Sequence, residues 1–255
     1  MNINEMHYNF RLKADKIHGL TNDDFVPAQI DWLLNLAQLI EVKKRYLPFN
    51  NVRKGFEGIQ KRIDDLSTLH VKSPQKQPAI IPTLLAGRLL DSNIYECKFS
   101  DFEFTYMFLT GLRAKISDGD DCIKNIGLSQ IQEDDLNEGL INVNTRPDFN
   151  WGTALFTIDA SSADTDAPGS IYIFSGDFEV DEVYPSYLRY PRKLFFGGYT
   201  SLDGLYTAVS PVVSCELPTI IHDNIVDTAT ELAAAPLQDP EFLQLAKVNS
   251  EKFEY

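Results

Sequence analysis

The stretch that decides the fold is Ser170–Lys193, SIYIFSGDFEVDEVYPSYLRYPRK. Apolar and β-branched residues favour a strand over Ile171–Phe174, the Ser-Gly-Asp that follows favours a tight turn, and a second strand is expected over Glu179–Tyr187. The stretch ends in tyrosines and arginines and holds no catalytic motif. It therefore predicts a β region with an edge that contacts another protein.

The middle of the chain, about 74–216, shows the same β pattern. From Phe102 to Ile116 the apolar residues keep one parity, which is typical of a strand with one buried face or of a hairpin bent at Thr110-Gly111. A short helix is expected over Asp134–Leu140. Further strands are expected over 153–158, 194–196 and 205–209.

Both ends of the chain favour helices. Apolar residues recur at three- and four-residue steps from Pro27 to about Tyr46, and proline suits a first helical position. Further helices are expected over 3–17, 56–69, from Pro218 to about 235, and over 240–253. Short amphipathic helices need partners, so the terminal helices are expected to pack together. The predicted fold class is α+β: a helical bundle from the N- and C-terminal segments (1–73 and 217–255) with an inserted antiparallel β domain (74–216).

The charge is unevenly distributed along the chain. The net charge is −14, but residues 1–72 hold 11 Lys and Arg against 9 Asp and Glu, whereas residues 73–255 hold 12 against 28. Because nucleic-acid binding needs cations that displace counterions from phosphate, the charge argues against tight DNA or RNA binding by the acidic part. The negative charge of residues 73–255 is compatible with a surface along which DNA passes without adhering.

Cysteine usage and hydropathy bear on the compartment. The three cysteines, Cys97, Cys122 and Cys215, are odd in number and show no CxxC spacing. No apolar segment suits a signal peptide or a membrane span. We expect a protein made and kept inside a cell, or exported only within a particle, with no membrane partner.

No residue pattern points to catalysis. The four histidines (His7, His18, His70, His222) lack metal-ligand spacing, and no nucleophile elbow or phosphate-binding loop occurs. The acidic loops at 118–121 and 159–169 lack the ligand pattern of a calcium loop. The sequence therefore predicts no catalytic residue, no metal site and no cofactor, and a protein that is not an enzyme.

One segment of the acidic half is cationic and aromatic, and it supplies the candidate site. Tyrosine and arginine dominate many protein interfaces, and Pro185 and Pro191 favour an edge strand. The predicted interface residues are Tyr187, Arg189, Tyr190, Arg192 and Lys193. In the alternative interpretation the tyrosines pack on the core while the cations extend to solvent.

The chain resembles the head-to-tail adaptor, or ring, proteins of short-tailed bacteriophages, particularly the crAss-like group. Four stretches carry the resemblance, in order along the chain: 6–13 with 27–46; 55–66; 132–136 with 171–193; and 216–229 with 239–240. Each is a weak motif alone. The chain departs from the family pattern in its loops, notably Asp159–Gly169.

The resemblance implies a virion structural protein of the head–tail junction, present in the host cytoplasm during assembly. Such a protein forms a closed ring, usually of twelve copies, below the portal protein and contacts further ring or tail proteins. It extends the channel through which DNA leaves, without binding DNA specifically. We expect some surplus acids of 73–255 to line that channel.

Two other functions stay open. A β-sandwich attachment protein that recognises host glycans would present exposed aromatic platforms. A hydrolase would need paired carboxylates that meet in a cleft of the folded chain.

Overall fold

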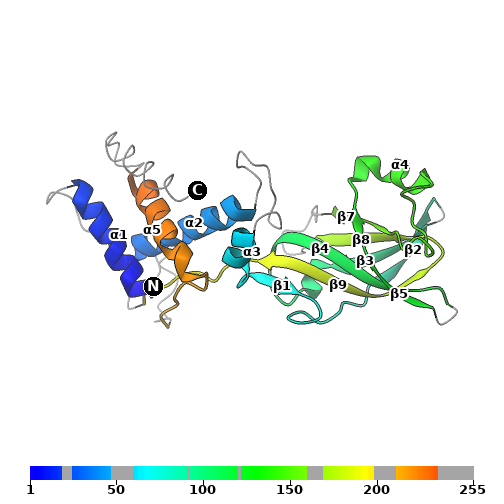
Figure 1. The fold of residues 1–255 in the computed structure, drawn as a ribbon, viewed down its shortest axis with the longest axis horizontal. Coiled ribbons are helices and arrows are strands. Elements are labelled where there is room, and N and C mark those ends of the chain that lie inside the picture. The colour runs from blue at the N-terminus through cyan, green and yellow to red at the C-terminus, as the bar shows by residue number, and fades with distance from the viewer. Residues whose placement is uncertain are drawn as a thin grey trace. The chain divides into compact units, whose positions relative to one another are not determined.

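The computed structural model describes residues 1–18, 25–46, 60–90, 92–119, 122–159, 169–197 and 211–234. The chain forms two compact units (Figure 1). The helical unit comprises Met1–Leu69 and Pro191–Tyr255, and the β unit comprises His70–Tyr190. The domain limits that we expect from the sequence, after residues 73 and 216, stay a prediction.

The helical unit contains α1 (Ile3–His18), α2 (Pro27–Tyr46), α3 (Gln60–Leu66) and α5 (Thr219–Ala234). Asn2 and Glu5 cap α1 reciprocally: the Asn2 side chain accepts from the Glu5 N–H at 2.8 Å, and the Glu5 carboxylate accepts from the Asn2 N–H at 3.0 Å. The helix predicted from Pro27 is confirmed as α2. Three cations in its last turn interact favourably with the negative end of the helix dipole, which stabilises the helix.

Apolar side chains of α1 and α2 pack against α5. Phe10, Leu34 and Ile225 are fully buried, and each such side chain contributes about 1.5–3 kcal/mol of burial free energy. The predicted stripe of α2 is confirmed at Ile30, Leu33, Leu34 and Ala37. The first residues of the predicted helix 56–69, and the whole of the predicted helix 240–253, lie outside the described residues.

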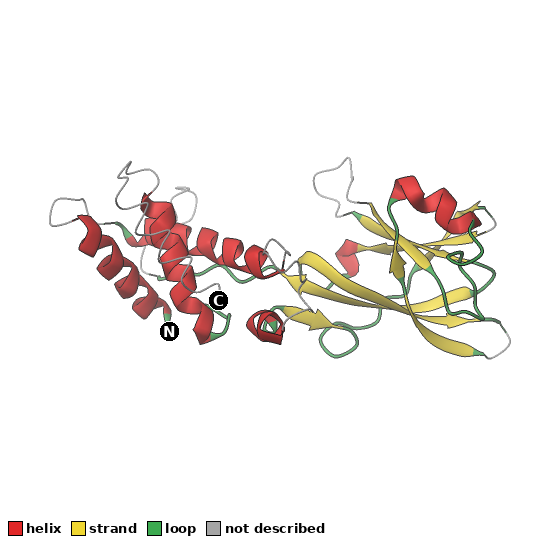
Figure 2. Cartoon of the chain, turned by 45° about the horizontal axis from the view of Figure 1, so that its top comes forward, coloured by secondary structure: helices red, strands yellow, loops and turns green. Residues whose placement is uncertain are grey.

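The β unit contains two sheets (Figure 2). One has the order β1-β9-β4-β5, and all its pairs are antiparallel. The other has the order β2-β3-β8-β7-β6, in which β6 and β7 are parallel. The strand bounds are β1 His70–Lys72, β2 Thr83–Leu89, β3 Ser92–Lys98, β4 Tyr106–Ser117, β5 Ile123–Gly127, β6 Ser129–Gln130, β7 Leu155–Asp159, β8 Ser170–Ser175 and β9 Glu179–Arg189.

The two strands of Ser170–Lys193 are confirmed as β8 and β9, but they belong to different sheets. At the turn between β8 and β9 the chain therefore crosses from one sheet to the other, and we call this turn the corner. Residues of both sheets meet in one core, with Ile116 and Val183 from one sheet against Ile171 and Ile173 from the other. The β unit is therefore a two-layer sandwich.

The predicted alternation from Phe102 to Ile116 is confirmed only in part. Leu112, Ala114 and Ile116 are buried on one face of β4. The strand begins at Tyr106, and pairing with β9 shifts register twice before Leu112. These irregularities change the inward parity, so that Leu109 also packs against the core.

The outer face of the five-stranded sheet is covered in part by α4 (Leu136–Ile141), which follows the 3₁₀ helix η4 (Glu133–Asp135). Leu136 and Leu140 pack against Leu155 and Phe174 of the sheet. The short helix predicted over 134–140 is confirmed. The predicted strand 194–196 is instead an isolated bridge between Phe195 and Val213, and 205–209 lies outside the described residues.

The predicted fold class is wrong. We expected a helical bundle with an inserted antiparallel β domain, but sheets of four and five strands dominate the described chain, against five α-helices. Five strands (β1, β2, β3, β5 and β6) had no counterpart among the expected elements, which led to an overestimate of the helical share. The described chain is therefore mainly β, and its long helices belong to a separate unit.

Candidate functional site

Tyr187, the first predicted interface residue, lies in the core of the β unit and has no exposed surface. Its hydroxyl donates to Gln77 Oε1 at 3.0 Å and accepts from the Phe104 N–H at 3.3 Å. Its ring lies 4.8 Å from that of Phe102, centroid to centroid. For Tyr187 the interface prediction is therefore corrected: the side chain packs inward, and a partner cannot reach it.

Arg189 and Tyr190 end the β unit and reach its surface. The Arg189 guanidinium lies 5.5 Å from the centroid of the Phe104 ring and donates to the Tyr190 carbonyl at 3.3 Å. The Tyr190 backbone N–H donates to the Thr105 carbonyl at 3.1 Å, while its side chain is 48% exposed. Tyr190 is therefore exposed to a partner, whereas Arg189 is half-buried.

Arg192 and Lys193 belong to the helical unit and are exposed. Glu216 accepts from the Arg192 N–H at 2.8 Å, and its carboxylate lies 3.9 Å from Arg192 Nε. The Arg192 side chain is 74% exposed, so this ion pair adds little stability. The structure thus divides the predicted interface between two units, and only the part within each unit can be described as one surface.

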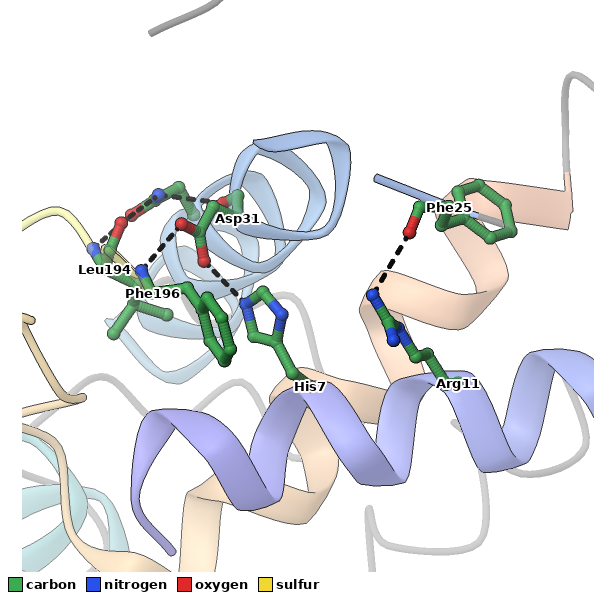
Figure 3. Close-up of polar contacts among 7 residues, drawn as sticks. His7, Arg11, Phe25, Asp31, Leu194 and Phe196 are labelled. Atoms are coloured by element: carbon green, nitrogen blue, oxygen red, sulfur yellow. Dashed lines mark hydrogen bonds and ion pairs between the residues drawn. The ribbon is translucent and has the colours of Figure 1, made fainter. Parts of the chain in front are cut away.

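A buried histidine–aspartate pair in the helical unit was not predicted as a site (Figure 3). His7 Nε2 of α1 lies 2.7 Å from Asp31 Oδ1 of α2, and both side chains are 5% exposed. The other Asp31 oxygen accepts from the Phe196 N–H at 2.8 Å, and the His7 ring stacks on the Phe196 ring at 4.4 Å.

Asn35, one turn beyond Asp31, holds the same segment. Its amide oxygen accepts from the Leu194 N–H at 2.7 Å, and its nitrogen donates to the Leu194 carbonyl at 3.0 Å. On α1, Arg11 donates to the Phe25 carbonyl at 3.4 Å (Figure 3). Histidine–carboxylate pairs serve catalysis when they orient a nucleophile. Here the contacts fix residues 194–196 on α2, which is a structural task.

A second buried polar network joins α2, α3 and α5. Arg45 donates to Glu41 one turn earlier and to Asp65 Oδ2 at 3.1 Å, and the Thr228 hydroxyl donates to Glu41 Oε1 at 2.8 Å. Glu41 and Asp65 form a buried acid pair of the kind that the hydrolase alternative requires. Both carboxylates are held by Arg45 and covered, so this pair is not open to a substrate.

Two thiols and one histidine outside these networks are poorly activated. Burial raises the pKa of Cys97 to about 12 and of Cys215 to about 11, which keeps both thiols protonated near neutral pH. Burial lowers the pKa of His222, whose Nε2 lies 2.8 Å from the Leu217 carbonyl. The surroundings therefore do not make these thiols more nucleophilic or this imidazole a stronger base.

Over the described ranges, no group of three or more His, Cys, Asp and Glu side chains could hold a metal ion. Within the same ranges, no helix is both long and apolar enough to cross a membrane. No protein-family model and no curated protein matches the chain.

Proposed function

We propose that the chain is a structural subunit of a phage head-to-tail adaptor, one copy of a closed ring that stacks on the portal and extends the DNA exit channel. The sequence resemblance motivates this proposal. The observation that carries it is a set of large apolar side chains on the surface of the helical unit. Tyr8 is 66% exposed, Trp32 60% and Ile220 73%, and subunit contacts would cover them.

The polar groups of the helical unit support the same interpretation. Buried carboxylates in the described helices brace one helix or segment against another: Asp227, for example, binds Lys13 at 2.6 Å and so joins α5 to α1. A part of a large assembly needs such rigidity and no reactive group. The β unit holds 9 Lys and Arg against 19 Asp and Glu, a net charge of −10 that would keep DNA from adhering to a channel wall.

Electron microscopy of the full chain mixed with the portal protein of the same phage tests this proposal. We expect an additional ring of density on the portal, with about twelve copies of the chain. Portals without added density, or a chain bound elsewhere on the particle, would overturn the assignment.

A second candidate is the glycan-binding attachment module, which one specific observation favours. Trp151 is 84% exposed at the end of a turn in the mainly β unit. The turn is well defined, because Asp148 accepts from the Trp151 N–H at 3.0 Å and bridges Thr153. Aromatic faces stack on sugar rings, so glycan-array binding that is lost in Trp151→Ala would favour this candidate over the adaptor.

A further inference from the structure

The solvent face of the four-stranded sheet is cationic. Strand alternation places His70 and Lys72 on the side of β1 opposite the buried Val71, and Arg113 and Lys115 on the side of β4 opposite the core. Cross-strand pairing sets Lys72 beside Ser186, Arg113 beside Tyr184 and Lys115 beside Glu182, all on β9. These side chains therefore share one surface.

Lys76 joins this surface from the turn after β1. Its ammonium donates to the His70 carbonyl at 3.0 Å. Arg113 reaches across the sheet to donate to the Ser73 carbonyl at 3.3 Å. We name Lys72, Lys76, Arg113 and Lys115 the cationic face. Acids of β9 offset part of its charge. Glu182 binds Lys115 at 3.2 Å and accepts from the Tyr184 hydroxyl at 2.5 Å, Asp181 helps to raise the pKa of Lys115, and Glu179 lies opposite Ser117 at the end of β4.

The outer face of the five-stranded sheet carries the opposite charge. Glu96 lies on β3 between the buried Tyr95 and Cys97, and Asp159 ends β7. Four exposed acids lie on η4 and α4, which cover this sheet. We name Glu96, Glu133, Asp134, Asp135, Glu138 and Asp159 the acidic face; Lys98 is a cation within it.

The surroundings of Tyr172 indicate that several of these acids lie close to one another. Tyr172 lies on β8 directly beside Glu96 of β3. Burial raises the pKa of its hydroxyl, and the charges of Glu96, Asp159 and Glu133 raise it further. Carboxylates from β3, β7 and η4 are therefore close enough to act on one group.

The two faces lie on opposite sides of the β unit, because the sheets share one core between them. Figure 1 shows α4 on the side of β7 and β8 away from β1 and β9. A two-fold dimer through either face would set like charges against each other. A head-to-tail contact sets opposite charges together, and such heterologous contacts form a ring when the rotation between neighbouring copies closes.

We propose that the cationic face of one chain docks on the acidic face of a second copy, and that this contact repeats around the ring. The inference rests on the proposed ring assembly and names the surfaces that form it. A second copy suits the cationic face better than a nucleic acid does, because the β unit as a whole has a net charge of −10, which would repel phosphate.

Charge reversal tests the pairing in the full chain. One variant carries Lys72→Glu and Lys76→Glu, a second carries Asp134→Lys and Glu138→Lys, and a third carries all four changes. The control, Lys61→Glu with Arg146→Glu, makes the same charge change as the first variant but at exposed positions that belong to neither face. Association is measured by analytical ultracentrifugation at low salt, and circular dichroism confirms that each variant folds.

We expect each two-residue face variant to associate at least tenfold more weakly than the wild type. The four-residue variant, and an equal mixture of the first two variants, should regain association because opposite charges meet again. The control should behave as the wild type. Carbodiimide crosslinking of mixed ¹⁵N-labelled and unlabelled chains should join Lys72 or Lys76 of one chain to Asp134 or Glu138 of another.

Other outcomes overturn the inference. If wild-type rings form on the portal and the face variants form them equally well, the docking surfaces are wrong while the proposed function stands. If the wild type neither self-associates nor binds the portal, the proposed function falls with the inference. Binding of a DNA duplex that is lost in the Lys72 and Lys76 variant, without self-association, would assign the cationic face to nucleic acid.

Discussion

At the scale of single residues, the structure separates side chains that look alike in the sequence. Tyr187 and Tyr190 lie three positions apart, yet the first is fully buried and the second is 48% exposed. The difference arises because Val183, Pro185 and Tyr187 share the inward side of β9, whereas Tyr190 follows the end of the strand. The cluster of tyrosine and arginine is therefore two environments and not one surface.

Removing the two hydroxyls should show this difference. Tyr187→Phe removes the acceptor of the Phe104 N–H, whereas Gln77 Oε1 still accepts from the Glu103 N–H at 2.7 Å. The loss should lower the free energy of unfolding by about 1–3 kcal/mol. Tyr190→Phe is the matched control and should change it by less than about 0.5 kcal/mol. Urea unfolding of both variants measures the effect, and equal stabilities would contradict the buried role of Tyr187.

His70 should make stability depend on pH. Burial and the neighbouring Lys72 and Lys76 lower its pKa from 6.5 to about 4, so the unfolded chain binds a proton more readily than the folded chain between these values. The stability contributed by neutral His70 is present above pH 6.5 and is lost as the pH falls towards 4.

Thermal unfolding at pH 7 and pH 5 checks the His70 prediction. The melting temperature should fall in both the wild type and His70→Gln, because other groups also titrate, but it should fall less in the variant. A variant as acid-sensitive as the wild type would show that His70 does not contribute.

At the scale of elements, the sequence predicted best where a local pattern decides the structure. The period of α2 and the alternation of β8 and β9 were sufficient to identify these elements. Strand β2 was missed because its apolar residues do not alternate and an Ala-Gly pair interrupts them, and β5 because it is short. No local pattern shows that β8 and β9 enter different sheets, since that depends on partners distant in the chain.

The candidate site illustrates the same limit. The cationic face was foreseeable in part, because Arg113 and Lys115 alternate with the buried residues of β4. Its other members come from β1 and the turn that follows, about forty residues earlier, and only the pairing of β9 with both strands unites them. Likewise, no spacing could indicate that His7 meets Asp31.

The corner between β8 and β9 should be sensitive to a single methyl group. A Cβ at Gly176 would lie 2.8 Å from the Pro147 carbonyl oxygen, and this backbone atom cannot rotate away. Gly176→Ala should therefore lower the free energy of unfolding by about 1–3 kcal/mol. The control is Gly127→Ala on β5, where nothing lies within 4 Å of the new carbon. Chemical denaturation should leave this control near the wild type; equal losses would contradict the close approach.

At the scale of the whole molecule, the chain combines a helical unit, braced by buried polar contacts, with a β-sandwich that carries opposite charges on its two faces. The exposed apolar side chains of the helical unit and the charged faces of the β unit are both surfaces that an assembly would cover. Of the predicted interface residues, Arg189 and Tyr190 reach solvent on the β unit, and Arg192 and Lys193 reach it on the helical unit. They would add a third set of contacts.

Replacing Arg189, Arg192 and Lys193 together with alanine tests this third contact. We expect ring assembly to fail while circular dichroism stays that of the wild type, because these side chains lie at the surface. Alanine at Lys43, Lys61 and Arg146 removes the same charge from other exposed positions and should leave assembly intact. Loss of the fold in the first variant would instead indicate that the cations only support packing.

The central claim is that the chain works as one of many identical copies in a closed ring. Native mass spectrometry of the full chain, alone and with the portal protein, tests it most directly. The account predicts a single assembly whose mass adds a fixed number of chains, about twelve, to that of the portal. A chain that remains a monomer in both samples would contradict the account.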